Sequence, residues 1–269
     1  MHQKRESIGK GKNMNTLTVK DLCKTYIINK RQNNVLKNIN MEIREGEMVA
    51  VMGPSGSGKS TLLYTVSGMD HLTAGRVDFF GKDINALNPA QMSSLRLNEM
   101  GFIFQQMYML KNLSIYDNII LPAYQSKNGR GKEHRKQIND RAKELMHKLG
   151  ISEIAEHDIN EVSGGQLQRA CICRSLINQP KMIFADEPTG ALNQLNSKEV
   201  MKELNRINAE GTTIMLVTHD MKVAAKSDRV LYIEDGSIKG EYVFGKYKGQ
   251  EENREREKKL SVWLMEMGF

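Results

Sequence analysis

The chain has 269 residues, of which 39% are apolar and 26% are charged, a balance typical of a globular protein with a substantial core. No apolar run approaches the ~18 residues of a membrane span, and the first residues, MHQKRESIGKGK, lack the apolar stretch of a signal peptide, so we expect a cytoplasmic protein. The net charge of +7 is compatible with nucleic acid, an anionic membrane surface or a polyphosphate ligand.

The N-terminal third contains a predicted tail, two strands and a loop. We expect a flexible basic tail at residues 1–13, because this stretch is polar and the periodic sequence begins near Met14. The segment VLKNINMEI alternates apolar and polar residues as a half-buried strand does, whereas MVAVM is continuously apolar, as in a buried strand. The second strand leads directly into GPSGSGKST, and the following LLYTVSGM is suited to a helix.

The loop GPSGSGKST fits the pattern G-x-x-x-x-G-K-[ST] in the strand-to-helix context that the pattern requires. Glycines let backbone N–H groups point at a phosphate, and the helix N-terminus adds partial positive charge. Lys59 supplies a charge for the outer phosphates, and the hydroxyl of Ser60 can ligate magnesium. A merely flexible glycine-rich loop is the less favoured alternative. The predicted nucleotide-binding residues are Gly53, Pro54, Ser55, Gly56, Ser57, Gly58, Lys59, Ser60 and Thr61.

The middle of the chain changes from strands to helices. A predicted strand, GRVDFFGKDI, precedes a helix from Pro89 to Asn98 and an apolar run, GFIFQQ, that ends in paired glutamines. From about residue 108 to 175 the pattern becomes helical, and we interpret this part as a helical subdomain inserted into an α/β core. One helix face there carries Ile138, Ala142, Leu145, Met146 and Leu149, and Gly150 suits its C-terminus.

Polar residues follow three later elements. Ser163, with Gly164 and Gly165, suits an N-cap that exposes backbone N–H groups, although an ordinary helix cap explains it equally well. The apolar strand MIFADE ends in Asp186 and Glu187, and TTIMLVTHD ends near His219. If these strands are parallel neighbours, their ends lie beside the phosphate loop. Asp186 would then hold magnesium, Glu187 would orient or deprotonate the attacking water, and His219 would face the departing phosphate.

The order GPSGSGKST, FQQ, VSGGQLQR, FADEPTG and THD resembles the nucleotide-binding subunit of ATP-binding cassette (ABC) transporters over roughly Leu17 to Gly245. The resemblance implies an α/β P-loop NTPase core, with a mixed sheet, flanking helices, an antiparallel β subdomain and the inserted helical subdomain. The nucleotide-binding domain would occupy residues 14–245. The cofactors would be ATP and Mg²⁺, and two chains would hold two ATP molecules head to tail.

The same resemblance assigns roles to single residues. Tyr26 would stack on adenine, and Gln105 would contact magnesium and relay the nucleotide state to a membrane subunit. Ser163, Gly164, Gly165 and Gln166 would contact the γ-phosphate of ATP held by the other chain. The implied catalytic residues are Lys59, Glu187 and His219, and the implied metal ligands are Ser60, Gln105 and Asp186.

Two positions depart from the family pattern. Val162 stands where the motif before Ser163 usually has Leu, a change between apolar residues that should matter little. Asn193 replaces the usual Asp of the segment that crosses the dimer interface, so it would be a contact in trans. Because Asn keeps a hydrogen-bonding carbonyl but lacks the charge, we expect this contact to survive in weaker form.

Within the family, EGEMVAVMGPSGSGKSTLL and ADEPTGALN resemble the branch of macrolide exporters, lipoprotein release and resistance to bacitracin-like and lantibiotic-like peptides. The GALN ending and the C-terminal SVWLMEMGF favour the peptide group. The implied partner is a permease with a large extracytoplasmic domain, which would hold the chain at the cytoplasmic face of the plasma membrane. Lipoprotein release, macrolide export and a cell-division-type ATPase that signals through a membrane partner remain alternatives. Partnership with nucleic acid is disfavoured, because the chain has one cassette and neither a coiled-coil nor a zinc insert.

The last part of the chain carries predicted partner-facing features. VLYIEDGSIKGEYVFG predicts a hairpin that turns at Asp235 and Gly236. Residues 246–269 predict a solvated charged stretch, ENREREKK, and an amphipathic helix, for which packing on its own domain is favoured over a contact with a second chain or permease. Its apolar face contains Leu260, Trp263, Leu264 and Met267. The cluster Tyr108, Met109 and Leu110 lies where the family receives a helix of the permease.

The chain contains three cysteines. Cys23, Cys171 and Cys173 have spacings that fit neither a zinc site nor a disulfide framework. We therefore expect reduced, packed thiols.

Overall fold

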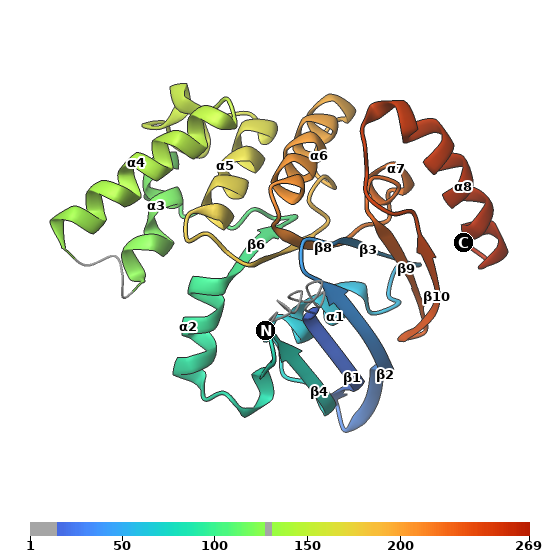
Figure 1. Cartoon of the computed structure of the whole chain (residues 1–269). Coiled ribbons are helices and arrows are strands. Elements are labelled where there is room, and N and C mark those ends of the chain that lie inside the picture. The colour runs from blue at the N-terminus through green and yellow to red at the C-terminus, as the bar shows by residue number, and fades with distance from the viewer. Residues whose placement is uncertain (1–14, 127–130) are drawn as a thin grey trace, which may run out of the picture.

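The computed structural model describes residues 15–126 and 131–269, so the predicted tail at residues 1–13 lies outside the described residues. Figure 1 shows a central sheet with helices above it and a smaller antiparallel sheet below it. The central sheet has the strand order β10-β9-β3-β8-β7-β6. Its strands are β3 (Met48–Met52), β6 (Met100–Phe104), β7 (Met182–Asp186), β8 (Thr213–Val217), β9 (Arg229–Glu234) and β10 (Ser237–Val243).

The pairing within the central sheet confirms the predicted α/β class. Strand β3 pairs in parallel with both β8 and β9, and β7 pairs in parallel with both β6 and β8. Strand β10 is antiparallel to β9, and the chain reverses between them at Asp235 and Gly236, which have φ values of 49° and 76°. The predicted hairpin is therefore present.

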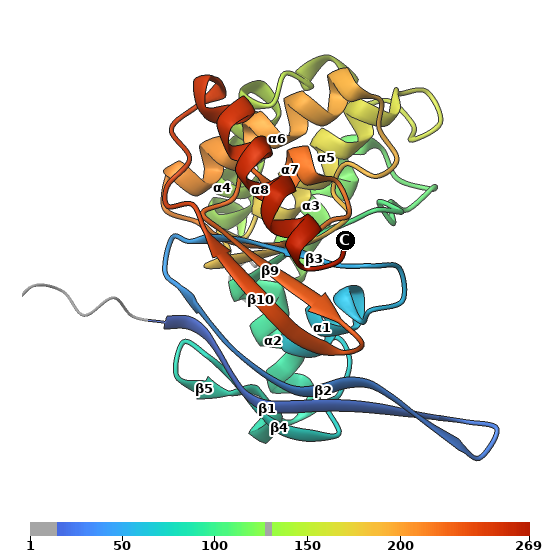
Figure 2. The same cartoon turned by 90° about the vertical axis from the view of Figure 1, so that its right-hand side faces the viewer.

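The smaller sheet is antiparallel and has the order β2-β1-β4-β5, with strands β1 (Asn15–Ile28), β2 (Arg31–Arg44), β4 (Ala74–Phe79) and β5 (Lys82–Asp83). Strands β1 and β2 form a long hairpin that extends away from the rest of the molecule in Figure 2. The prediction of one strand over GRVDFFGKDI is wrong. The chain turns back at Phe80 and Gly81, whose φ values are 47° and 74°, so that Lys82 pairs with Phe79.

The helices cover both faces of the central sheet. They are α1 (Lys59–Val66), α2 (Pro89–Glu99), α3 (Ile115–Gln125), α4 (Lys132–Lys148), α5 (Gly164–Leu176), α6 (Gln194–Ala209), α7 (Met221–Ala224) and α8 (Asn253–Glu266), with 3₁₀ turns at Ile84–Ala86, Ser152–Ile154 and Gln250–Glu252. Helix α2 begins after the N-cap Asn88 in a capping box with Gln91. Within the described ranges, no helix is long and apolar enough to cross a membrane.

The core is divided by the central sheet because successive side chains of a strand point to opposite faces. On β3, Met48, Ala50 and Met52 pack with helices α3 to α6 and α8. Val49 and Val51 pack instead with α1, α2 and the smaller sheet. Helices α1 and α5 therefore lie on opposite faces of the central sheet, as Figure 1 shows.

Helices α3, α4 and α5 pack against one another in the region predicted to be helical. The predicted apolar face of α4 is buried at Ala142, Leu145 and Met146. The helix ends as expected at Gly150, which has a φ of 62° and donates its N–H to the carbonyl of His147. In α5, Cys171 and Cys173 are fully buried free thiols, and burial raises the pKa of Cys171 to about 11.

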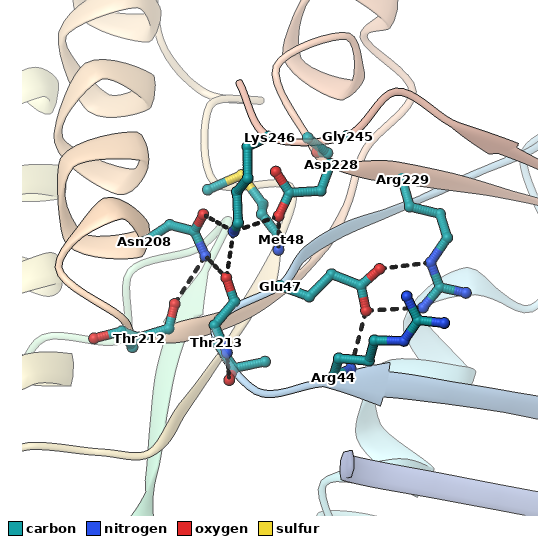
Figure 3. Close-up of polar contacts among 12 residues, drawn as sticks. Arg44, Glu47, Met48, Asn208, Thr212, Thr213, Asp228, Arg229, Gly245 and Lys246 are labelled. Carbon is teal, nitrogen blue, oxygen red and sulfur yellow. Dashed lines mark hydrogen bonds and ion pairs between the residues drawn. The ribbon is translucent and has the colours of Figure 1, made fainter. Parts of the chain in front are cut away.

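In the segment after β10, Lys246 makes polar contacts near the first residue of β3 (Figure 3). Lys246 Nζ lies 2.7 Å from Asp228 Oδ2 and 3.3 Å from Asn208 Oδ1. The same Asp228 oxygen accepts the N–H of Met48 at 2.9 Å. One lysine therefore links the C-terminal segment to the first residue of β3 and to helix α6.

Helix α8 packs on its own domain, which is the alternative that the sequence favoured. Leu260 and Leu264 are buried, and the ring of Trp263 lies 5.6 Å from that of Tyr242. The expectation that ENREREKK is solvated is wrong at Arg256, which is 6% exposed. Its guanidinium donates to the carbonyl groups of Ser227, Gly245 and Lys246, and its five N–H donors allow this burial.

Candidate nucleotide-binding site

The phosphate loop joins the end of β3 to the start of α1, and glycine is required at both of its ends. Gly53 has a φ of 152°, and a Cβ there would lie 1.9 Å from the carbonyl oxygen of Ile233. Gly58 has a φ of 100° at the N-cap position of α1. The sequence therefore places a tight loop of backbone N–H groups at a helix N-terminus, which is suited to a phosphate.

Lys59 lies over this loop. Its Nζ donates to the carbonyl oxygens of Gly53 at 2.9 Å and Pro54 at 2.7 Å. Partial burial lowers the pKa of Lys59, and the carboxylates of Glu187 and Asp186 oppose that effect. The lysine, the loop and the two acids thus belong to one site.

Asp186 contacts the first turns of α1. It is 7% exposed at the end of β7, where Oδ1 accepts the hydroxyl of Ser60 at 2.9 Å and Oδ2 accepts that of Tyr64 at 2.6 Å. Strands β3 and β7 are not direct neighbours, because β8 lies between them. Asp186 still reaches the phosphate loop, because the side chains of Ser60 and Tyr64 extend across this distance to its two oxygens.

Glu187 forms a pair with His219 at the same sheet edge. Its Oε1 lies 2.8 Å from His219 Nδ1 and accepts the backbone N–H of His219 at 3.1 Å. The Glu187 side chain is 14% exposed, and that of His219 is 68% exposed. Glu187 has a φ of 46°, a conformation that costs about 1 kcal/mol or more for a residue other than glycine. The site therefore keeps a strained acid beside an accessible imidazole.

Gln105 and Tyr26 approach this centre from two sides. Gln105 follows β6, and its side chain lies against Gly190, close to Glu187. A Cβ added to Gly190 would lie 3.0 Å from Gln105 Nε2 and 3.4 Å from Glu187 Cβ. Tyr26 on β1 donates its hydroxyl to Asp70. Burial and the contact with Asp70 raise the pKa of Tyr26, and a hydrogen bond with Thr61 opposes this in part. Tyr26 thus lies beside the end of the phosphate loop, where an adenine ring could stack.

The residues predicted to act in trans form a separate group at the N-termini of α5 and α6. The hydroxyl of Ser163 accepts the N–H of Gln166 at 3.3 Å, and Gln166 Oε1 accepts the N–H of Ser163 at 2.9 Å, which is a capping box. A Cβ on Gly165 would lie 2.5 Å from Asn196, whereas one on Gly164 would make an ordinary contact. Among the described residues, no hydrogen bond joins Ser163 or Gln166 to the phosphate loop.

Asn193 has a structural role that the sequence reading missed. Its Oδ1 accepts the N–H of Asn196 at 2.9 Å and thereby caps α6. Asn and Asp are equally good at this position. The departure from the family pattern therefore costs the helix nothing.

Two further residues were not anticipated. Tyr64 is one turn beyond Ser60 on α1, a spacing that would have placed both on one helix face. Gln168, which is 1% exposed, donates its Nε2 to the carbonyl of Pro188 at 2.8 Å and so joins α5 to the turn that follows Glu187. Gln168 could have been anticipated from the sequence, because it is a polar residue on the apolar face of α5.

The fold and this site define a P-loop nucleotide-binding protein, and comparisons with known proteins specify the family. The family described as "ABC transporter" matches residues 36–190. The chain is 40% identical over 222 residues to the uncharacterized ABC transporter ATP-binding protein YknY of Bacillus subtilis, covering 82% of this chain and 94% of YknY. It is 41% identical over 227 residues to the lipoprotein-releasing system ATP-binding protein LolD of Wigglesworthia glossinidia brevipalpis, covering 84% and 97%.

A longer relative and two solved structures also match this chain. The chain is 39% identical over 239 residues to the macrolide export ATP-binding/permease protein MacB of Psychrobacter arcticus, which covers 88% of this chain and 34% of MacB. Two dimeric structures of the bacterial ABC transporter cassette MJ0796 match it, one with a TM-score of 0.78 at 36% identity and one in a post-hydrolysis state bound to ADP and Pi, with 0.77 at 35%. Each covers 87% of this chain and 100% of the cassette.

The chain therefore belongs to the ABC transporter family. It is an ATP-binding cassette that hydrolyses ATP.

Proposed function

We propose that two copies of this chain hold two ATP molecules between them and drive a membrane permease. The observation that carries the proposal is the separation of the site into two groups within one chain. The phosphate loop and its acids adjoin α1, whereas Ser163 and its glycines begin α5 on the other face of the central sheet. In a head-to-tail pair, the phosphate-loop group of each chain faces the Ser163 group of the other chain. The dimers of the MJ0796 cassette support this arrangement.

The oxygens of Ser60 and Asp186 fit a magnesium site. Ser60 Oγ and Asp186 Oδ1 lie 2.9 Å apart, and the Gln105 amide approaches from β6. Mg²⁺ prefers oxygen ligands and is commonly held by one or two carboxylates together with substrate phosphates. When bound, the metal neutralises charge that develops on the transferred phosphate.

The remaining residues have complementary roles in hydrolysis. Lys59 exchanges its loop carbonyl partners for the outer phosphates, and the N–H groups of the loop hold the phosphate oxygens. Glu187 orients the attacking water and accepts its proton, while His219 holds that carboxylate in position. Ser163 and the N–H groups of Gly164 and Gly165 contact the γ-phosphate held by the partner.

A hollow at the β6 edge of the central sheet supports a permease contact. It has a volume of about 380 Å³ and lies between α2, β6, α3 and α5. Phe102, Phe104 and Tyr108 line it, and Tyr108 is 60% exposed. Arg174 donates to the carbonyl groups of Met107 and Tyr108, which fixes the loop that bounds the hollow. An exposed aromatic wall held in a rigid loop is suited to an inserted helix of the permease.

Within the family, we propose resistance to or export of antimicrobial peptides, with a permease that has a large extracytoplasmic domain and holds the cassette at the cytoplasmic face of the plasma membrane. The likeness to MacB and LolD supports this branch. The choice of peptides rests on the GALN ending of the segment after Glu187 and on the C-terminal SVWLMEMGF. Release of lipoproteins, as in the name of LolD, is the second candidate, since LolD matches at comparable identity.

Identification of the partner tests this proposal. The tagged chain is purified from membranes, its permease is identified, and ATP hydrolysis by the complex is measured with bacitracin-like and lantibiotic-like peptides. We expect a ten-span permease and stimulation by at least one peptide. A four-span permease, no stimulation, and loss of lipoprotein sorting on deletion would contradict the peptide proposal. Tyr108→Asp should abolish permease recovery and leave hydrolysis by the free cassette intact, whereas the matched change Tyr124→Phe in α3 should alter neither.

A further inference from the structure

We propose that Tyr64 is a positioning residue for magnesium, because its hydroxyl holds one oxygen of Asp186 so that the other faces the metal position with Ser60. The inference rests on the magnesium site proposed above. Tyr64 lies outside the phosphate-loop motif, which ends at Thr61.

The geometry gives each oxygen of Asp186 its own donor. Ser60 and Tyr64 are four residues apart on α1 and so share one helix face. The Ser60 hydroxyl lies 2.9 Å from Oδ1, and the Tyr64 hydroxyl lies 2.6 Å from Oδ2. With both oxygens occupied, the carboxylate cannot turn about its own axis without losing a hydrogen bond to a buried acceptor. A metal that uses Ser60 and Oδ1 leaves the Tyr64 contact in place.

The phenol is a reliable donor. A phenol has an ordinary pKa of about 10, so its hydroxyl keeps its proton at physiological pH. It also donates to an ionised acceptor, which gives a shorter and stronger bond than a neutral one does.

The ring that carries this hydroxyl is held by aromatic packing. Its centroid lies 6.4 Å from that of Phe104, and Phe104 stacks on Phe102 at 6.0 Å. Phe102 in turn stacks on Phe184 at 5.7 Å, two residues before Asp186 on β7. The ring of Tyr64 thus packs into the same aromatic cluster as Phe184, and Phe184 lies on the strand that carries Asp186. This shared packing fixes the hydroxyl and the carboxylate relative to each other.

Loss of this contact should affect metals unequally. Removing a partner that orients a metal ligand commonly weakens metal affinity by about tenfold or more. Mg²⁺ demands near-ideal octahedral geometry, whereas Ca²⁺ accepts flexible arrangements. A carboxylate that is free to turn should therefore weaken the use of Mg²⁺ more than the use of Ca²⁺.

The test is the variant Tyr64→Phe, which keeps the ring and removes the hydroxyl. Binding of a fluorescent, non-hydrolysable ATP analogue is measured while free Mg²⁺ or free Ca²⁺ is titrated separately. We expect the half-saturating Mg²⁺ concentration to rise about tenfold and that of Ca²⁺ to rise much less. Tyr124→Phe is the matched control, because it removes a phenol that donates to Asn139 at 2.9 Å in the helical region, and it should shift neither value.

Each outcome has a distinct meaning. A wild-type protein that needs Mg²⁺ and a Tyr64→Phe variant with the same Mg²⁺ requirement would overturn the role of Tyr64. Equal shifts for both metals would also overturn it, because they indicate general loosening and no selective loss of geometry. If nucleotide binding by the wild-type protein does not depend on Mg²⁺, the proposed metal site itself is wrong, whatever the variant does.

Discussion

The phosphate-loop group and the Ser163 group differ in how they are connected. Around the phosphate loop, Lys59 contacts backbone carbonyls, Ser60 contacts Asp186, and Glu187 contacts His219. Around Ser163, the contacts stay local, because Ser163 and Gln166 cap their own helix. The first group contains the cation Lys59, the two acids and the proposed metal position. The second offers helix N–H groups and uncharged polar side chains, so it can contribute to a phosphate site but supplies neither a cation nor an acid.

The two groups are nevertheless joined within one chain. Gln168, five residues beyond Ser163, donates to the carbonyl of Pro188, immediately after Glu187. A buried amide whose partner is lost leaves an unsatisfied group, which costs about 1 to 3 kcal/mol. The helix that carries the Ser163 group is therefore held to the turn that follows Glu187.

The largest expected effect comes from the phosphate-loop group. Glu187→Gln keeps the size of the side chain and removes its ability to accept a proton, so steady-state hydrolysis should fall at least about 100-fold. The variant should form a stable dimer with ATP, measured by size exclusion. Glu199→Gln, at an exposed acid on α6, is the matched control and should behave as wild type. Unchanged hydrolysis by Glu187→Gln would remove this acid from the mechanism.

Ser163→Asp tests the other group without disturbing its helix. Asp caps a helix as well as Ser does, so the melting temperature should not change, whereas Ser163→Ala should lose about 1 kcal/mol of stability. The added carboxylate repels a γ-phosphate, so ATP-dependent dimerisation and hydrolysis should be lost while ADP binding by the single chain is retained. Full hydrolysis by Ser163→Asp would show that the Ser163 group contacts no phosphate.

Asn193→Asp should have the smallest effect. The cap on α6 is equally good with either residue, and the new charge should strengthen the proposed contact across the interface. We expect turnover to rise moderately, by about twofold, with little change in melting temperature. Equal or lower turnover in a side-by-side assay would mean that Asn193 does not limit the interface.

The elements that the sequence predicted well are those with strong local patterns. The runs MVAVM, MIFADE and TTIMLVTHD are buried strands whose ends carry the expected polar residues, and GPSGSGKST is the loop between strand and helix. Apolar runs and glycines at special φ values depend on a few neighbouring residues, so the chain alone reveals them.

Other features depend on contacts between distant segments. Tyr64 looks like an ordinary helix residue until β7 brings Asp186 to it from 122 positions away. Arg256 sits in a charged run that predicts exposure, but carbonyl groups from residues 227, 245 and 246 surround it. The turn at Phe80 and Gly81 was also missed, because Phe80 is a strand former forced to a positive φ.

The central claim is that each chain carries two halves of two different sites, and mixing two inactive variants tests it most directly. Lys59→Ala damages only the phosphate-loop group, and Ser163→Asp damages only the Ser163 group. Each alone should lack ATP hydrolysis. In an equimolar mixture, half of the pairs contain both variants and have one intact site, so turnover should recover to about one quarter of the wild-type value. No recovery on mixing, with both variants folded and able to pair, would contradict the account.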